Sequence, residues 1–311
     1  MGNGTANRPA PELLRAHCQV FSRLGWALFL QLAVMAVVQA AAGFWAALAA
    51  PDLLSDPLFL WLLSVLSVYG AGLPAFCLVL RGAPPLPAAE PCPLSPGRFF
   101  QVLVVCLGAT YLLNLFTLAL LELVGQLLGA PVRNPVEQME SYPALLNVLL
   151  GCVIAPAAEE FIFRGQLLGR LRPYGERFAL PASALCFGLF HGNLSQFFYA
   201  SAIGLVLGWV ALRTGRLWQP ILLHALVNSV STVLVPLLEP FGAAGDAALS
   251  ALVLGSIGLG ALFFAELRRE PLWSDAPGPL PLRWACRVFF ESPGVACFLL
   301  LALALCAAWL F

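Results

Sequence analysis

The stretch ALLNVLLGCVIAPAAEEFIFRG, residues 144–165, places two adjacent acidic residues at the end of a long apolar run. About 20 apolar residues are enough for an α-helix to cross a lipid bilayer, so the run predicts a membrane-spanning helix. Ionisable side chains inside such a helix are costly to bury and usually serve a function. Glu159, Glu160 and Arg164 are therefore the first candidate functional residues of the chain.

Helical spacing separates the two acids of this stretch. Glu160 and Arg164 are four residues apart, so they share one face of the helix and can form an ion pair. Glu159 points about 100° away from Glu160 on the helical wheel. A helix-end ion pair would explain Glu160 and Arg164, but it would leave Glu159 without a purpose. Pro156, one turn before the acids, removes a backbone donor and should kink the helix.

The apolar character extends over the whole chain. Of its 311 residues, 60% are hydrophobic and only 10% are charged, whereas a soluble domain carries about 25% charged residues. We therefore predict an all-α fold, a polytopic transmembrane helix bundle with about eight or nine spans. The segments predicted to span the membrane lie near residues 24–50, 58–80, 99–128, 143–163, 178–192, 195–212, 217–238, 247–266 and 292–311.

The charged residues outside these spans indicate partners and topology. The 16 basic residues balance the 16 acidic ones, and this zero net charge gives no indication of nucleic-acid binding. We expect membrane lipids and a peptide or lipidated protein as partners, while the oligomeric state is not defined by the sequence. Arginines are enriched in alternate loops, for example at Arg170, Arg213 and Arg268. Because such residues mark the cytoplasmic side, we predict a multi-pass integral protein of a bacterial-type plasma membrane with a cytoplasmic N-terminus.

Two histidines and an amide are the other strongly polar candidates inside the spans. His191 ends the stretch CFGLFH, four residues after Phe187, and His224 precedes Asn228 by four residues. Each histidine alone could be a hydrogen-bonded core residue. Because isolated polar groups are expensive to bury, we expect the histidines, the amide and the two acids to meet inside the bundle.

Two chemistries fit these residues. A carboxylate and a histidine can activate water as a general base, and a histidine with an amide can donate hydrogen bonds to an oxyanion. This combination suits amide hydrolysis without a cofactor, which is the interpretation we favour. Zinc is the alternative, since two His and a Glu could hold it, but the HExxH pattern is missing. The nine cysteines show no zinc-ligand spacing and predict no disulfide framework.

Three motifs in this order resemble those of the CAAX protease and bacteriocin-processing family, whose best-known members are the type II CAAX prenyl endopeptidases. The family pattern is EExxxR, FxxxH and HxxxN on successive membrane helices. The chain carries EEFIFR at 159–164, FGLFH at 187–191 and HALVN at 224–228. The resemblance covers roughly residues 99–240. It implies an intramembrane endopeptidase of the glutamic type, although the family has also been described as metalloproteases.

The resemblance implies a role for each motif residue. Glu159 would be the base that polarises a water molecule, with His191 assisting it. Glu160 and Arg164 would support the site.

The third motif would supply the groups that stabilise the reaction intermediate. His224 and Asn228 would donate hydrogen bonds to the oxyanion. The active cavity would open toward the cytosol and the lipid.

The chain divides into three regions on this basis. We predict a two-helix addition with a Pro-rich loop at 1–98, a catalytic helix bundle at 99–240, and membrane helices with a Pro-rich linker at 241–311. We assign no chemistry to the first two spans or the last one. Glu122 is expected to hydrogen-bond within the bundle or to line the cavity. The alternatives to a peptidase are a non-catalytic membrane scaffold, a bacteriocin-immunity factor and a small transporter.

Overall fold

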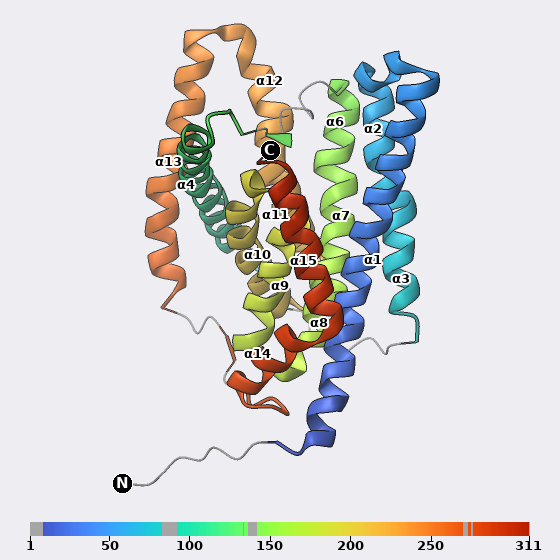
Figure 1. The fold of residues 1–311 in the computed structure, drawn as a ribbon. Coiled ribbons are helices and arrows are strands. Elements are labelled where there is room, and N and C mark those ends of the chain that lie inside the picture. The colour runs from blue at the N-terminus through green and yellow to red at the C-terminus, as the bar shows by residue number, and fades with distance from the viewer. Residues whose placement is uncertain are drawn as a thin grey trace.

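A computed structural model describes residues 9–82, 92–132, 134–135, 142–269, 273–274 and 276–310. Helices are the only regular secondary structure in these residues, which confirms the predicted all-α class (Figure 1). Part of the predicted Pro-rich loop, residues 83–91, lies outside the described residues.

Three of the N-terminal helices begin at prolines, which suit a first turn because they lack the N–H that this turn leaves unpaired. Asp56 caps the helix that begins at Pro57 by accepting a hydrogen bond from the N–H of Phe59 at 2.7 Å. The bounds are Pro11–Ala49 for α1, Pro51–Ser55 for the 3-10 helix η1, Pro57–Val65 for α2, Leu66–Gly72 for the π-helix η2 and Leu73–Val79 for α3.

The next helices contain the two acids. Ser95 caps α4, and Gly129 ends it in the left-handed conformation with φ of 74°. The bounds are Pro96–Leu128 for α4, Ala144–Leu149 for α6, Leu150–Ile154 for the π-helix η3, Ala155–Glu160 for α7, Phe161–Leu168 for the π-helix η4, Gly169–Leu171 for α8 and Arg172–Tyr174 for the 3-10 helix η5.

The remaining helices complete the bundle. Asn193 caps α10, accepting a hydrogen bond from the N–H of Gln196 at 2.9 Å. The bounds are Glu176–Phe190 for α9, Leu194–Thr214 for α10, Trp218–Ser229 for α11, Val230–Leu234 for the π-helix η6, Val235–Leu238 for α12, Glu239–Phe241 for the 3-10 helix η7, Ala243–Leu267 for α13, Leu282–Glu291 for α14 and Pro293–Ala308 for α15.

Seven helical segments of the described chain are long and apolar enough to cross a membrane. An eighth results if α14 and α15, which are bent by 67°, count as one span. The segment predicted at 178–192 is the one that falls short, because α9 has only 15 residues. At 1.5 Å per residue it spans about 22 Å, less than the bilayer core of about 30 Å. The chain is therefore a polytopic helical membrane protein, with seven or eight candidate spans in its described residues.

The end of the predicted C-terminal linker is helical. Leu282–Glu291 forms α14, which buries Ala285, Val288 and Phe289 on one face and carries Arg287 on the other. This amphipathic spacing is typical of a helix, but the prolines of the preceding residues led to the prediction of a linker.

A central hairpin organises the bundle (Figure 1). α9 and α10 pack against each other, and α10 also contacts α4 and α11. On one side α4 packs against α13, and on the other α1 packs against α15, η2 and α3. Buried side chains from all three predicted regions, such as Phe21, Phe187 and Phe298, belong to one apolar core.

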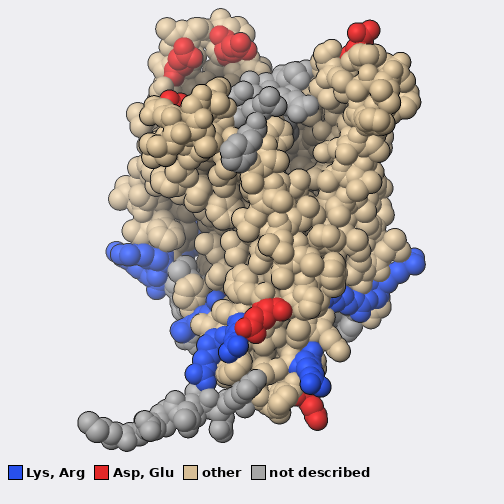
Figure 2. Space-filling model, in the orientation of Figure 1, with Lys and Arg blue, Asp and Glu red and all other residues tan. Residues whose placement is uncertain are grey.

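The basic residues gather at one end of the long axis of the bundle. Figure 2 shows them, together with some acidic side chains, near the end where α1 begins, whereas the described residues at the other end of this face show acidic side chains and no basic ones. Asp52 and Asp56 lie in the turn between α1 and α2, and Glu239 and Asp246 lie near the turn between α12 and α13. This distribution agrees with the enrichment of arginine in alternate loops of the sequence. One arginine of the sequence, Arg133, falls in a loop on the acidic side, and it lies outside the described residues.

The interface between α4 and α13 depends on glycine. A Cβ atom on Gly260 would lie 3.0 Å from the carbonyl oxygen of Val104 and 3.4 Å from Cα of Gly108. Small residues allow such close approach of membrane helices, which association in lipid depends on because lipid tails are as apolar as the side chains.

We therefore expect Gly260→Leu to lower the thermal unfolding temperature of the detergent-purified protein, since overpacking costs about 1–3 kcal/mol. Gly258→Leu is the matched control, because Gly258 lies on the same helix and has no atom within 4 Å of an added Cβ. Equal unfolding temperatures for the two variants would contradict the proposed close contact.

Candidate active site

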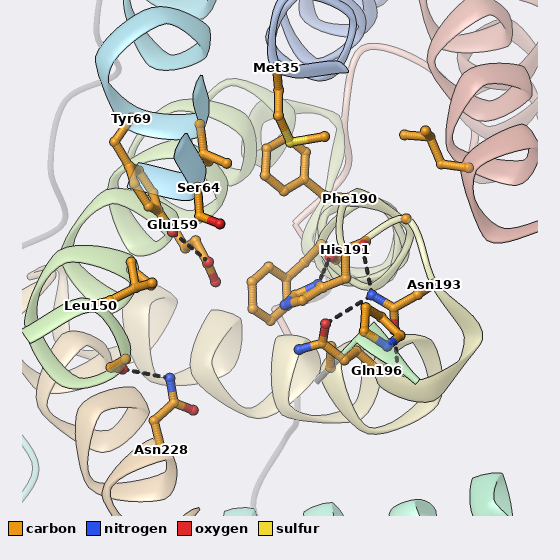
Figure 3. Close-up of a pocket in the computed structure, with 18 of the residues that line it drawn as sticks. Met35, Ser64, Tyr69, Leu150, Glu159, Phe190, His191, Asn193, Gln196 and Asn228 are labelled. Atoms are coloured by element: carbon orange, nitrogen blue, oxygen red, sulfur yellow. Dashed lines mark hydrogen bonds between the residues drawn. The ribbon is translucent and has the colours of Figure 1, made fainter. Parts of the chain in front are cut away.

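A cavity of about 420 Å³ lies inside the bundle (Figure 3). Four of the six predicted site residues line it, together with residues from α1, α2, η2, α10 and α15. Figure 3 shows the side chains of Glu159 and His191 facing this space from different helices. The predicted site residues that line the cavity are Glu159, His191, His224 and Asn228.

Glu160 and Arg164 form the ion pair that their spacing predicted. Nη1 of Arg164 donates to Oε1 of Glu160 at 2.8 Å, and the two side chains are 1% and 0% exposed. Nη2 of Arg164 donates to the carbonyl oxygen of Gly204 at 3.2 Å, and the guanidinium carbon lies 4.4 Å from the ring centre of Phe187. The pair thus connects the helix that carries the acids with α9 and α10. Neither member is among the described residues that line the cavity.

His224 lies between the two carboxylates. Its Nδ1 is 3.0 Å from Oε1 of Glu160, and its Nε2 is 3.9 Å from Oε2 of Glu159. Because Glu160 accepts from Arg164 as a carboxylate, Nδ1 of His224 must be the donor in this hydrogen bond. The ring nitrogen directed at Glu159 is therefore Nε2. The motif pattern alone did not indicate this bridging position.

His191 is held by the end of its own helix. Its Nδ1 lies 2.9 Å from the carbonyl oxygen of Phe187, and a carbonyl can only accept, so Nδ1 carries the hydrogen. In the neutral ring the lone pair is then on Nε2. Gly192, with φ of 63°, and Asn193, whose Nδ2 donates to the carbonyl oxygen of His191 at 2.8 Å, complete the turn. Among the described residues, no hydrogen bond joins His191 directly to Glu159.

Asn228 compensates for the proline that precedes the acids. In the π-helix η3 the N–H of Ala155 donates to the carbonyl oxygen of Leu150, five residues back. The corresponding donor for Gly151 would be Pro156, which has no N–H. Nδ2 of Asn228 donates to that carbonyl oxygen at 2.8 Å instead. The disturbance expected from Pro156 therefore takes the form of a π-turn, and it fixes the amide at the cavity wall.

Tyr69 is the site residue that sequence reasoning missed. Its hydroxyl donates to Oε1 of Glu159 at 3.4 Å, and it belongs to η2, in a region to which no chemistry was assigned. The same region contributes Met35 and Ser64 to the cavity wall, and the last span contributes Leu305. A single tyrosine in an apolar span is not ionised at neutral pH and carries no motif, so no sequence signal distinguished it.

Glu122 lies apart from these residues. It is exposed on α4 and accepts a hydrogen bond from Gln126, four residues along the same helix, at 3.0 Å. It does not belong to the described residues that line the Glu159 cavity. Glu122 is therefore hydrogen-bonded along its own helix at an exposed position, which matches neither of the two expectations.

The donor set does not form a metal site in the described residues. No three His, Cys, Asp or Glu side chains of these residues are arranged so that they could hold a metal ion. Oε1 of Glu160 accepts from both Arg164 and His224, whereas its buried Oε2 has no hydrogen-bond partner among the described residues. The residues as arranged do not fit a three-ligand zinc centre. All nine cysteines are free.

The fold and the cavity define a class: a polytopic helical membrane protein with a carboxylate and two histidines facing an internal cavity. Residues 141–230, which contain all six predicted site residues, match the family described as Type II CAAX prenyl endopeptidase Rce1-like. The predicted resemblance is confirmed over this segment.

A curated relative supports the same assignment. The chain is 31% identical over 96 residues to the protein named "Putative membrane peptidase YdiL" of Bacillus subtilis (strain 168). The match covers 30% of this chain and 38% of that relative, so well under half of either protein is compared. No solved structure matches the chain.

The buried ion pair leads to a stability prediction. Arg164→Met leaves Glu160 buried without its cation, and breaking a buried pair in this way costs about 3–5 kcal/mol. We expect a large fall in the thermal unfolding temperature of the detergent-purified variant.

A second arginine provides the matched control. Arg287 and Glu291 form the same four-residue pair at 2.9 Å, but both side chains are 61% exposed. An exposed pair contributes at most about 1 kcal/mol, so Arg287→Met should change the unfolding temperature little. Similar effects of the two substitutions would argue against a structural role for the buried pair.

Proposed function

We propose that this protein is an intramembrane endopeptidase in which Glu159 activates a water molecule to hydrolyse a peptide bond. The observation that carries the proposal is the asymmetry of the two acids. Glu160 is bound to Arg164 away from the cavity, whereas Glu159 faces the cavity and forms no ion pair with an arginine of the described chain. A general base needs a free lone pair, for which an arginine would compete. The match to a prenyl endopeptidase family supports the same class of reaction.

In the proposed reaction a water molecule donates hydrogen bonds to Glu159 and to Nε2 of His191. Glu159 takes a proton while the water oxygen attacks the peptide carbonyl carbon, which gives a tetrahedral intermediate with one oxyanion. Protonated Glu159 then gives the proton to the amide nitrogen as the C–N bond breaks. The products are an amine and a carboxylic acid, which ionises, and Glu159 returns to its initial form.

The oxyanion would be stabilised by His224 and Asn228. Since Nδ1 of His224 donates to Glu160, Nε2 can also donate only when the ring carries both protons. In that form the ring and Arg164 together balance the charges of Glu159 and Glu160, which lowers the cost of burying the cluster. When Glu159 takes a proton from water, the new oxyanion restores the balance. Asn228 keeps one N–H beyond the one that it donates to a backbone carbonyl.

The proposed substrate is a membrane-associated peptide or a lipidated protein. The family resemblance implies the CAAX type, which has a carboxyl-terminal Cys followed by two aliphatic residues and a variable one. The cavity wall includes Met35, Phe190, Leu305 and Trp309, whose apolar surfaces suit a lipid chain or aliphatic side chains. The arginine-rich end of the bundle supports a cytoplasmic N-terminus. The match to a Bacillus subtilis relative supports a bacterial-type plasma membrane as the proposed location.

We expect Glu159→Gln to abolish cleavage while the protein still folds, because the amide keeps the side-chain shape but cannot take up a proton. New peptide termini in membranes of cells that produce the wild type should be missing from cells that produce the variant, as measured by quantitative mass spectrometry. Glu122→Gln is the control, since it removes an exposed carboxylate outside the cavity, and it should leave these termini unchanged.

Identical membrane peptides in wild-type and Glu159→Gln cells would contradict the proposal. If the variant also had a lower unfolding temperature, the polar cluster would instead serve the stability of a non-catalytic scaffold or immunity factor.

The proposed reaction uses no cofactor, and zinc is the alternative to be tested. We expect 1,10-phenanthroline to leave unchanged the rate at which the purified protein in proteoliposomes cleaves a farnesylated CAAX peptide. Elemental analysis should find no stoichiometric zinc in the active preparation. Zinc at one ion per chain, with activity lost to the chelator and restored by added zinc, would replace the glutamic mechanism by a metal-dependent one.

A further inference from the structure

The phenol of Tyr69 contacts the proposed base from outside the segment that matches the peptidase family. Its hydroxyl donates to Oε1 of Glu159 at 3.4 Å. The family match covers residues 141–230, whereas Tyr69 lies in η2 between α2 and α3. The contact therefore joins the N-terminal helices to the reactive group of the candidate site.

The two oxygens of Glu159 have different surroundings. Oε1 accepts from the phenol of Tyr69, and Oε2 lies 3.9 Å from Nε2 of His224. The Glu159 side chain is only 13% exposed, so its orientation depends on neighbouring protein groups more than on bulk water. A donor on one oxygen and an imidazole near the other together define the direction in which the remaining lone pairs face the cavity.

A phenol suits this position better than a cation would. A carboxylate inside a membrane protein needs a polar partner because its burial alone is expensive. Arg164 cannot be that partner, since it is bound to Glu160 and to the carbonyl oxygen of Gly204. A neutral donor stabilises and orients the carboxylate but competes less strongly for its lone pairs than a guanidinium, so the carboxylate keeps its capacity to take up a proton.

The backbone around Tyr69 is fixed by close packing. A Cβ atom on Gly72 would lie 3.0 Å from the carbonyl oxygen of Gln31 on α1. Residues Leu66–Gly72 form a π-helix, a rare conformation that is frequent at functional sites and changes the direction of the side chains that it carries. The position of the phenol thus depends on the packing of η2 against α1.

We infer that Tyr69 is a positioning residue of the active site, which orients the carboxylate of Glu159 for its reaction with water. This inference rests on the proposed function, because it assigns Tyr69 a role through Glu159. It extends the site to the N-terminal helices, which the three sequence motifs do not include.

The first test does not need a substrate. Dicyclohexylcarbodiimide is an apolar reagent that modifies protonated carboxyl groups, and mass spectrometry of the detergent-purified protein can follow its addition to Glu159. Tyr69→Phe removes only the hydroxyl, so Glu159 should be modified several-fold faster than in the wild type, since a hydrogen bond to a carboxylate is worth roughly a tenfold change in an equilibrium. Tyr142→Phe is the control for modification, because the Tyr142 hydroxyl lines the same cavity but is hydrogen-bonded to Ser64 at 2.9 Å.

The second test measures cleavage of the farnesylated CAAX peptide in proteoliposomes. Tyr69→Phe should lower kcat by roughly tenfold with little change in KM and no change in unfolding temperature. A merely structural role would change the unfolding temperature or KM instead. Tyr174→Phe, which removes a hydroxyl bonded to His17 at 2.8 Å outside the cavity, should leave kcat unchanged.

The outcomes separate this inference from the proposed function. Wild-type rates of both modification and cleavage in Tyr69→Phe, with Glu159→Gln inactive, would overturn the role of Tyr69 and leave the peptidase intact. No Glu159-dependent cleavage by the wild type would overturn the peptidase, and the catalytic role of Tyr69 with it. Faster modification in Tyr69→Phe would then show a contact that serves only the structure.

Discussion

The buried ion pair between Arg164 and Glu160 is the constraint on which the rest of the site depends. Two opposite charges with almost no exposure are stable inside an apolar bundle only when they are paired and further hydrogen-bonded. Arg164 is held further by the Gly204 carbonyl and the face of Phe187, and Oε1 of Glu160 also accepts from His224. Nε of Arg164 and Oε2 of Glu160 have no hydrogen-bond partner among the described residues. Because Gly204, Phe187 and His224 come from three other helices, the ion pair fixes the arrangement of the helices around the cavity.

Because Arg164 pairs with Glu160 and not with Glu159, the two adjacent acids have different properties. Glu160 has its charge balanced by Arg164, and its Oε1 also accepts from His224, so it acts on the cavity through the orientation of His224. Glu159 has a phenol and a more distant imidazole, neither of which neutralises it by a permanent charge. Glu160 is thus a structural carboxylate, whereas Glu159 can exchange a proton. The difference results from the rotation of about 100° between neighbouring positions of a helix.

The part of this site that the sequence predicted is the part determined within single helices. The four-residue spacing of Glu160 and Arg164 predicts their ion pair, and the apolar runs predict the helices. Distances between helices depend instead on packing, such as the approach of Gly72 to Gln31 that sets the position of Tyr69. Spacing within a helix cannot report such contacts. The bounds of α9 were predicted to within two residues, since the polar turn at Gly192 interrupts the apolar sequence, and only the counting of this 15-residue segment as a full span was wrong.

The irregular backbone near the acids and the polar side chain of Asn228 depend on each other through one hydrogen bond. A π-turn and a proline near the acids leave the Gly151 carbonyl without its backbone donor, and Asn228 supplies the missing hydrogen bond. An unpaired carbonyl inside a membrane protein would cost several kcal/mol, about as much as a buried polar side chain without a partner. The hydrogen bond therefore provides a partner for both the carbonyl of Gly151 and the half-buried amide of Asn228. A helix without the π-turn would have no place for the amide, and a helix without the amide would have an unsatisfied carbonyl at the cavity wall. This mutual dependence explains why a polar group can be held at a defined position in an otherwise apolar bundle.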